Sequence, residues 1–256
     1  MTKRLITCIA LVLILVSLSA AVPSSTSKKI DGNESLSQSI NPANMSTPID
    51  SSLKIDSPEH REINVQELKI VDSGFHQATG ISRFGFILKN LNETAGYRMS
   101  KYQVSAYDNV GRVLGTFESL IQFLFPGERI GIVGYLNIPE DARIDHIQIQ
   151  VIDGDPIEPK VAKNLLSVEN LNYIQDRYAP KVTGVINNSA NQTMENIDVS
   201  VIFFDETGRL SDGLETHVNF VPAAGKSAFE ISSYGTKSPS RMEAFAESSD
   251  WSIQQA

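Results

Sequence analysis

The sequence has very little cysteine, and this scarcity excludes several kinds of chemistry. Its only cysteine, Cys8, lies inside an apolar run at the N-terminus. Once that run is removed, no disulfide, catalytic thiolate or cysteine-ligated metal remains possible. Because no cysteine follows small residues at the end of the run, we also predict no lipid anchor. Stability must then come from the burial of apolar side chains.

Positive charge is also scarce. The net charge is −8, and loss of Lys3 and Arg4 with the N-terminal run would make it −10 (−8 − 2). No block rich in lysine or arginine occurs anywhere in the chain. Since phosphate groups are neutralised by clustered cations, we predict no binding to nucleic acid and no attraction to anionic membrane surfaces.

Signatures of catalytic and metal sites are missing. The four histidines have none of the spacings typical of zinc sites, and no Gly-x-Ser-x-Gly motif occurs. The Asp-Gly-Asp segment at 153–155 lacks the series of acidic residues that calcium loops need. We therefore predict no catalytic residue, no metal site and no cofactor. His146 is expected to be a solvated surface histidine on the polar side of the strand predicted over 147–151.

The N-terminus has the layout of a secretory signal peptide. Basic residues precede the apolar run Leu5–Val16, and small residues follow it. We predict a signal peptide over 1–21, cleaved after Ala20 or Ala21. The alternative is an uncleaved anchor, because Leu5–Val22 is close to the shortest length that spans a bilayer. Either reading predicts a secreted or cell-surface protein that meets a membrane only through this segment.

A polar segment follows. Residues 22–60 are rich in Ser, Thr, Asn and Pro and show no regular apolar period. Such a segment cannot bury enough apolar surface to offset its conformational entropy, so we predict a disordered linker.

The remainder of the chain repeats itself. Asp108–Val113 reads Asp-Asn-Val-Gly-Arg-Val, and Asp205–Leu210 reads Asp-Glu-Thr-Gly-Arg-Leu, 97 positions later (205 − 108). Each copy follows a segment in which apolar and polar residues alternate, the period of a half-buried strand. The repeat indicates two copies of one small β-rich unit.

Short strands separated by turn signals predict an all-β fold. We expect two tandem immunoglobulin-like β-sandwich domains, over 61–157 and 158–256. Asn164–Leu171 is the only short helical candidate, and it fits the start of a strand equally well. The residues expected in the two cores are Val104, Ala106, Ile147 and Ile149, and then Val199, Val201 and Phe203.

The turns have their own signals. Aspartate bonds its own backbone in turns and glycine accepts a positive φ. The residues predicted to form structural turns are Asp108, Gly111, Asp205, Gly208, Pro126, Gly127 and Gly225.

These segments resemble the FxLYD domain family. Val104-Ser-Ala-Tyr-Asp108 and Val201-Ile-Phe-Phe-Asp205 match the strand and turn after which that family is named. Gly-x-x-x-Asn strands that end near Asn90 and Asn188 resemble its preceding element, and Pro126-Gly127 and Ala224-Gly225 resemble its Pro-Gly turn. Val replaces the family's Phe in both copies, and a related immunoglobulin-like module with the same turn is the alternative. The resemblance implies an exported prokaryotic β-sandwich and carries over no catalytic residue.

Three sequons fall in predicted loops. Asn92, Asn187 and Asn191 each begin an Asn-x-Ser/Thr acceptor motif, so we list them as candidate glycosylation sites.

The sequence thus predicts an exported structural or binding module without catalytic activity, which meets a surface protein or glycan. The alternative is an accessory domain pair that recognises carbohydrate or peptide. An enzyme would require a pocket with convergent carboxylates or a Ser–His pair.

Overall fold

The computed structural model describes residues 65–77, 81–161, 163–176, 180–232, 235 and 238–248. The predicted signal peptide (1–21) and linker (22–60) lie outside these residues. The described residues form antiparallel strands and contain no helix, so the all-β prediction is confirmed. Consequently, no helix in this part of the chain is long and apolar enough to span a membrane.

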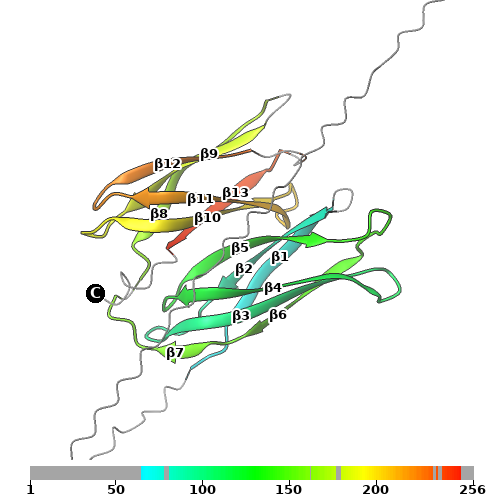
Figure 1. The fold of residues 1–256 in the computed structure, drawn as a ribbon, viewed down its shortest axis with the longest axis horizontal. Coiled ribbons are helices and arrows are strands. Elements are labelled where there is room, and N and C mark those ends of the chain that lie inside the picture. Colours follow the sequence, from blue (N-terminus) through cyan, green and yellow to red (C-terminus); the bar gives the residue numbers. More distant parts are fainter. Residues whose placement is uncertain are drawn as a thin grey trace, which may run out of the picture. The chain divides into compact units, whose positions relative to one another are not determined.

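The N-terminal half of the described chain forms two sheets (Figure 1). One has the order β1-β2-β5, and the other has the order β4-β3-β6 with β7 also paired to β3. The strands are β1 (Lys69–Gln77), β2 (Ile81–Lys89), β3 (Gly96–Tyr107), β4 (Val113–Leu124), β5 (Arg129–Asn137), β6 (His146–Ile152) and β7 (Asp155–Ile157).

The C-terminal half repeats this arrangement. Its sheets have the orders β12-β9-β8 and β11-β10-β13, which match β5-β2-β1 and β4-β3-β6 strand for strand. The strands are β8 (Leu166–Ile174), β9 (Lys181–Asn188), β10 (Met194–Phe204), β11 (Leu210–Val221), β12 (Lys226–Ser232) and β13 (Arg241–Ser248). The segment from Leu166 is therefore a strand, which resolves the choice between helix and strand at Asn164–Leu171.

A shared irregularity links the halves. Met99 in β3 and Asn196 in β10 have positive φ angles of 58° and 52°, and both are skipped in the pairing with the next strand. The two residues lie 97 positions apart (196 − 99), the same separation as the Asp turns. Because a positive φ is uncommon for residues other than glycine, its recurrence at matched positions supports the internal repeat.

Each half has its own hydrophobic core between its two sheets. Val104 and Ala106 are fully buried, and Ile147 and Ile149 are half-buried against the same cluster. Val199, Val201 and Phe203 lie in the cluster of the C-terminal half. All seven core predictions thus fall in the expected clusters. Face-to-face packing of antiparallel sheets is consistent with a β-sandwich.

A third cluster joins the halves. Ile87 and Val133 from β2 and β5 pack against Ile202, Phe204 and Leu210 from the C-terminal half. The β1-β2-β5 sheet is therefore covered on both faces. Its strands alternate poorly between buried and exposed residues for that reason, and Phe84, Phe86, Ile87 and Leu88 are all buried.

Candidate functional site

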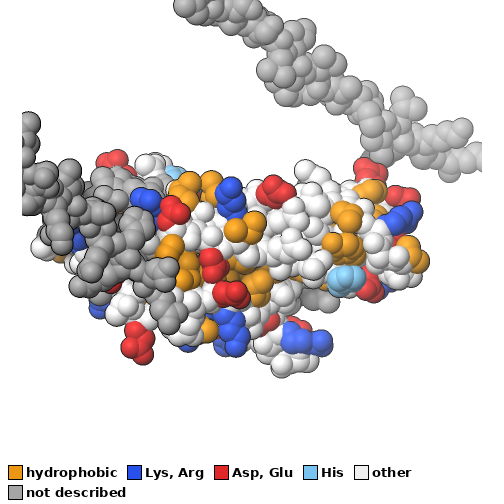
Figure 2. All heavy atoms as spheres, turned by 90° about the horizontal axis from the view of Figure 1, so that it is seen from below, with side chains coloured by type: hydrophobic (Ala, Val, Ile, Leu, Met, Phe, Trp, Pro, Cys, Tyr) orange, Lys and Arg blue, Asp and Glu red, His pale blue; other side chains and the backbone are white. Residues whose placement is uncertain are grey.

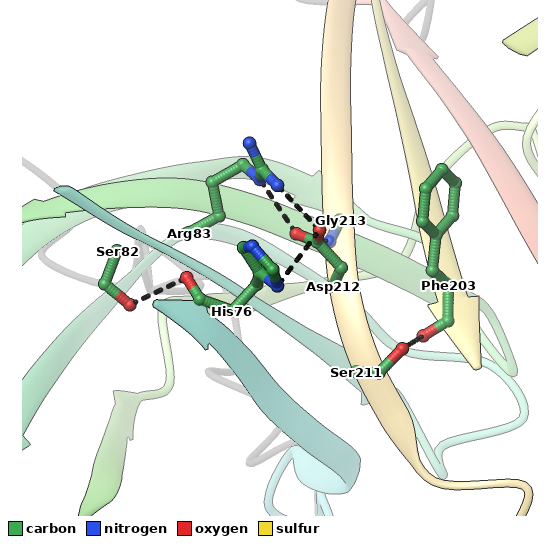
Figure 3. A network of polar contacts seen from close by, with 7 residues as sticks. All are labelled: His76, Ser82, Arg83, Phe203, Ser211, Asp212 and Gly213. Atoms are coloured by element: carbon green, nitrogen blue, oxygen red, sulfur yellow. Dashed lines mark hydrogen bonds and ion pairs between the residues drawn. The ribbon is translucent and has the colours of Figure 1, made fainter. Parts of the chain in front are cut away.

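The contact between the halves contains a buried ion pair (Figure 3). Arg83 on β2 donates from Nε and Nη2 to the two carboxylate oxygens of Asp212 on β11, at 2.8 and 2.7 Å. The backbone N–H of Gly213 donates to the same carboxylate at 2.8 Å. The Asp212 side chain is only 5% exposed and that of Arg83 only 14%. The hydrogen bond to Asp212 raises the pKa of Arg83, so its guanidinium stays charged.

The groups around this pair do not form a catalytic arrangement. His76 Nδ1 lies 3.8 Å from Asp212 (Figure 3). The nearby hydroxyls of Ser82 and Ser211 donate to the backbone oxygens of His76 and Phe203. Neither hydroxyl is shown bonded to the His76 ring, so this network lacks the nucleophile–base hydrogen bond that a serine triad needs. Its chemistry is that of a cross-link between two sheets.

Glycines allow the two sheets to approach closely. A Cβ on Gly74 would lie 2.0 Å from the Leu210 carbonyl oxygen, and one on Gly131 would lie 2.5 Å from the Phe245 ring. On the opposite sheet, a Cβ on Gly213 would lie 2.6 Å from Val133. These contacts are too short for any side chain, so glycine at these positions sets the separation of the sheets.

Beside this contact lies a cavity of about 490 Å³ that both halves line. Its acidic residues come from different elements: Glu128 precedes β5, whereas Asp198, Glu215 and Glu247 lie on β10, β11 and β13. His217 Nδ1 lies 3.0 Å from Asp198 at the same cavity.

Burial changes the protonation of these acids. Burial raises the pKa of Glu128 to about 7. The hydrogen bond that its carboxylate accepts from Phe125 N acts in the opposite direction and lowers this pKa, but the effect of burial is larger. Burial also raises the pKa of Glu247 well above its usual range, with Glu128 and Asp198 adding repulsion. Glu215 is shifted upward by burial and then by Asp198. Carboxyl groups with raised pKa values in a cavity are typical of functional sites, although structural networks also produce them.

Among the described residues, no group of three or more His, Cys, Asp or Glu side chains has an arrangement that could hold a metal ion. Calcium would need six to eight oxygens at about 2.3–2.6 Å.

The two predicted Asp turns are present and closely similar. Asp108 accepts hydrogen bonds from Val110 N and Arg112 N, and Asp205 accepts them from Thr207 N and Arg209 N. The Arg112 side chain lowers the pKa of Asp108, and the Thr207 hydroxyl lowers that of Asp205. The glycines that close the turns, Gly111 and Gly208, have φ angles of 83° and 80°.

The Pro-Gly turn is only partly as predicted. Pro126 and Gly127 form a turn closed by Glu128 N donating to Phe125 O, and Gly127 has a φ of 67°. In the second copy the closing bond runs from Gly225 N to Pro222 O, and the residue with positive φ is Ala224, at 47°. The prediction for Gly225 is therefore displaced by one residue: it occupies the position of Glu128, not that of Gly127.

Two buried asparagines are structural residues that the sequence analysis treated only as strand ends. Asn90 Nδ2 donates to Ala95 O and Phe125 O, and Asn188 Nδ2 donates to Gln192 O, Val221 O and Pro222 O. Their exposed fractions are 0% and 1%. Each amide joins the loop that follows its strand to the Pro turn. The asparagine of the Gly-x-x-x-Asn pattern is the sequence signal from which this role could have been predicted.

The candidate glycosylation sites differ in accessibility. Asn191 is exposed in a loop, as predicted. Asn92 lies in a loop but is only 6% exposed, and its amide nitrogen donates to Gln66 O and to Asn90 Oδ1. Asn187 lies within β9 and is paired with Lys226, so its prediction as a loop residue is wrong.

His146 and several aromatic side chains make contacts that a structural role explains. His146 is exposed beside Asp145 and stacks on Tyr107. Phe123 and Phe125 are buried against each other, so neither ring offers an exposed binding face. Tyr173 packs on Phe203 in the C-terminal core. His60 lies outside the described residues.

Comparison with known proteins identifies no family. No protein-family model matches the sequence, and no curated protein matches it. Among solved structures, one that is similar is a transglutaminase from red sea bream, with 13% identity and a TM-score of 0.24. The match covers 73% of this chain and 30% of that chain, so this chain corresponds to less than a third of the transglutaminase. A similarity this weak carries no argument about function.

Proposed function

We propose that this chain is an exported, non-catalytic module in which two tandem immunoglobulin-like β-sandwiches of the FxLYD type act as one rigid unit. It would serve at the cell surface or outside the cell, as a structural element or as a binding partner of a surface protein or glycan. The observation that carries this proposal is the interlocked contact between the halves, with Arg83 bonded to Asp212 and sheet glycines packed against side chains of the other half.

The internal repeat supports the tandem arrangement. Strand order, the Asp turns, the buried asparagines and the residues with positive φ recur at separations of 97 or 98 positions. These are local structural features and not a catalytic set, which favours a shared scaffold over a shared reaction.

The contact between the halves supports rigidity. Domains that move relative to one another generally share small, polar interfaces. Here the third hydrophobic cluster and a bidentate ion pair lie together at the contact. Such a contact favours a spacer or a binding platform whose geometry is fixed.

Mass spectrometry of the native protein from separated cell fractions tests this proposal. We expect a mature N-terminus at Ala21 or Val22, or an intact anchor in the membrane fraction, and we expect any glycan on Asn191. A full-length chain beginning at Met1 in the cytoplasmic fraction would overturn the proposal.

Recognition of carbohydrate or peptide is a second candidate. A groove of about 640 Å³ runs over the outer side of β3, β4 and β6. Gln103, Glu118 and Gln150 form one cross-strand row in it, beside a second row made of Lys101, Leu120 and Ile152. Carboxamides that donate and accept hydrogen bonds suit neutral polar ligands. Binding on a glycan array that a Gln103→Ala, Gln150→Ala variant loses would favour this candidate.

The coloured part of one face of the molecule favours a local groove over a large hydrophobic interface. On the face seen in Figure 2, hydrophobic side chains lie in small groups between acidic and basic ones. Large contiguous apolar patches mark extensive protein interfaces, and none is seen among the described residues that this view shows.

A further inference from the structure

The contact between the halves joins two unlike sheet faces. The outer face of the β11-β10-β13 sheet packs on the outer face of the β1-β2-β5 sheet, which is not its equivalent in the repeat. A head-to-tail contact of this kind can add further units without limit, because each added unit offers a new face of the same type. The contact does not use the two equivalent faces, on β4-β3-β6 and on β12-β9-β8, and we call these the end faces.

The strand register shows which residues of the end faces correspond to the contact. Asn90 and Asn188 align β2 with β9, and Met99 and Asn196 align β3 with β10. The other strands follow from their pairing with these four. Each residue of the contact can therefore be compared with one residue of an end face.

The glycines that let the sheets approach are absent from the β12-β9-β8 end face. In the contact, a Cβ on Gly74 would lie 2.0 Å from a backbone oxygen of the other sheet, and one on Gly131 would lie 2.5 Å from an aromatic ring. Each equivalent position carries a side chain, so a sheet that docked in the same way would meet it. The equivalents of Gly74, Gly85 and Gly131 are Asn172, Thr183 and Ala228.

The same end face carries its own ion pairs. The equivalent of Val133 is Glu230, whose carboxylate lies 3.0 Å from Lys181 Nζ. Lys226 on β12 pairs with Glu169 on β8, and this second ion pair crosses the central strand β9. A second sheet placed over these four charges would remove them from water without giving them new partners, which is unfavourable.

The β4-β3-β6 end face lacks the other side of the contact. Gly115 stands where Asp212 accepts the arginine, so no carboxylate is present there. A polar side chain replaces each apolar group that the second half inserts, and a threonine replaces the glycine. The equivalents of Ile202, Gly213 and Phe245 are Ser105, Thr116 and Gln150.

We propose that the two end faces are caps that exclude a second copy of this chain, so that exactly two units stack. In a further contact of the same kind, Lys181 would face Gly115 and lack a carboxylate. Thr116 would face Glu230, where a glycine now faces a valine. Complementarity is thus lost from both sides at once, and polar outer faces on terminal units limit repeat stacks in the same way. The inference goes beyond the proposed function and requires neither export nor a ligand.

Two grafted variants of the full chain test the proposal by sedimentation velocity. The first restores the contact residues on β12-β9-β8, and the second restores them on β4-β3-β6. We expect the wild type and each variant alone to be monomeric, and an equal mixture of the two variants to form a heterodimer. A chain with both sets should form longer assemblies. The sets are Asn172→Gly, Lys181→Arg, Thr183→Gly, Ala228→Gly and Glu230→Val, and then Ser105→Ile, Gly115→Asp, Thr116→Gly and Gln150→Phe.

A matched control isolates the ion pair from the apolar fit. The second variant without Gly115→Asp keeps its apolar substitutions but offers no carboxylate to the grafted arginine. It should bind the first variant at least about tenfold more weakly, which corresponds to about 1.4 kcal/mol. Equal affinity with and without the aspartate would contradict the assigned contact.

Two further outcomes would overturn the proposal. One is a mixture of the grafted variants that stays monomeric although circular dichroism shows both to be folded. The other is a wild-type chain that forms dimers or longer species which Thr116→Arg dissociates. Should the grafted variants fail to fold, sedimentation of the wild type at its highest soluble concentration decides alone, with a monomer expected. None of these results depends on where the protein is located, so failure here is distinct from failure of the proposed function.

Discussion

Arg83 and Asp212 lie 129 residues apart in the chain, yet the guanidinium of one donates two hydrogen bonds to the carboxylate of the other. The pair connects β2 of the N-terminal half to β11 of the C-terminal half. Because both side chains are largely buried, neither can exchange its partner for water without a cost in free energy.

Loss of this carboxylate should strongly destabilise the protein. Asp212→Asn leaves the Arg83 charge buried without its partner, and we expect a loss of about 3–5 kcal/mol in the free energy of unfolding. Urea denaturation measures the change. The matched control is Asp155→Asn, because Asp155 forms an exposed pair with Arg98 and its loss should cost under about 1 kcal/mol. Equal losses in the two variants would contradict a buried cross-link.

The separation of the sheets should depend on a glycine. Gly213→Ala places a Cβ 2.6 Å from Val133, and we expect a loss of about 1–3 kcal/mol from overpacking. Val133→Ala removes the two methyl groups nearest that Cβ, so the double variant should lose less than the sum of the single variants. Chemical denaturation of all four proteins gives the coupling energy, and strict additivity would count against this contact.

The buried asparagines should matter equally in both halves. Asn188→Ala leaves the carbonyls of Gln192, Val221 and Pro222 without their donor, and we expect a loss on the order of 3 kcal/mol. Asn90→Ala should have a similar effect at the matched position. The exposed Asn191→Ala is the control, with a change within about 0.5 kcal/mol. Thermal unfolding compares the three variants, and a neutral Asn188→Ala would contradict the role given to the amide.

The two Pro turns should respond in opposite directions. Ala224 has a φ of 47°, a conformation that costs a non-glycine residue about 1–2 kcal/mol. Ala224→Gly should therefore stabilise the protein by up to about 1 kcal/mol, after subtraction of the backbone entropy that glycine loses on folding. Gly127→Ala, at the equivalent position, should destabilise it by a similar amount. The difference in urea midpoint between the two variants tests this, and changes of the same sign would refute it.

Stability should decrease as the pH rises through the range in which Glu128 titrates. Burial raises the pKa of Glu128 from 4.5 to about 7, so the folded state holds a proton that the unfolded state releases earlier. The stabilising contribution is complete below pH 4.5, declines between 4.5 and 7, and is lost above that range. Glu128→Gln should flatten this decline in urea-unfolding free energies, whereas Glu118→Gln should not. A stability that rises over the same range in the wild type, but not in Glu128→Gln, would reverse the sign of the argument.

Sequence reasoning was most successful where the signal is local. The alternation around Val104 and Val201 predicted strands, and Asp108, Gly111, Asp205 and Gly208 predicted turns. Those features depend on backbone preferences and on one apolar face, both of which a short segment encodes. The turn at Gly225 was displaced by one residue because Ala224 carries the positive φ that glycine usually provides.

The residues of the candidate site could not be predicted from the sequence. Glu128, Asp198 and Glu247 appear in the sequence as ordinary polar residues next to or within strands, and no spacing links them. Asn92 and Asn187 carry sequons, but whether a side chain is reachable depends on what folds over it or pairs with it.

The amino-acid sequence by itself determined the strands, the repeated Asp turns and the residues of the two cores, because each depends on neighbours a few positions away. Only the tertiary structure decided that the β1-β2-β5 sheet is buried on both faces, that Arg83 meets Asp212, and that four carboxylates share one cavity. These arrangements join residues up to 129 positions apart, and they follow from how two folded surfaces fit together, which no local pattern records.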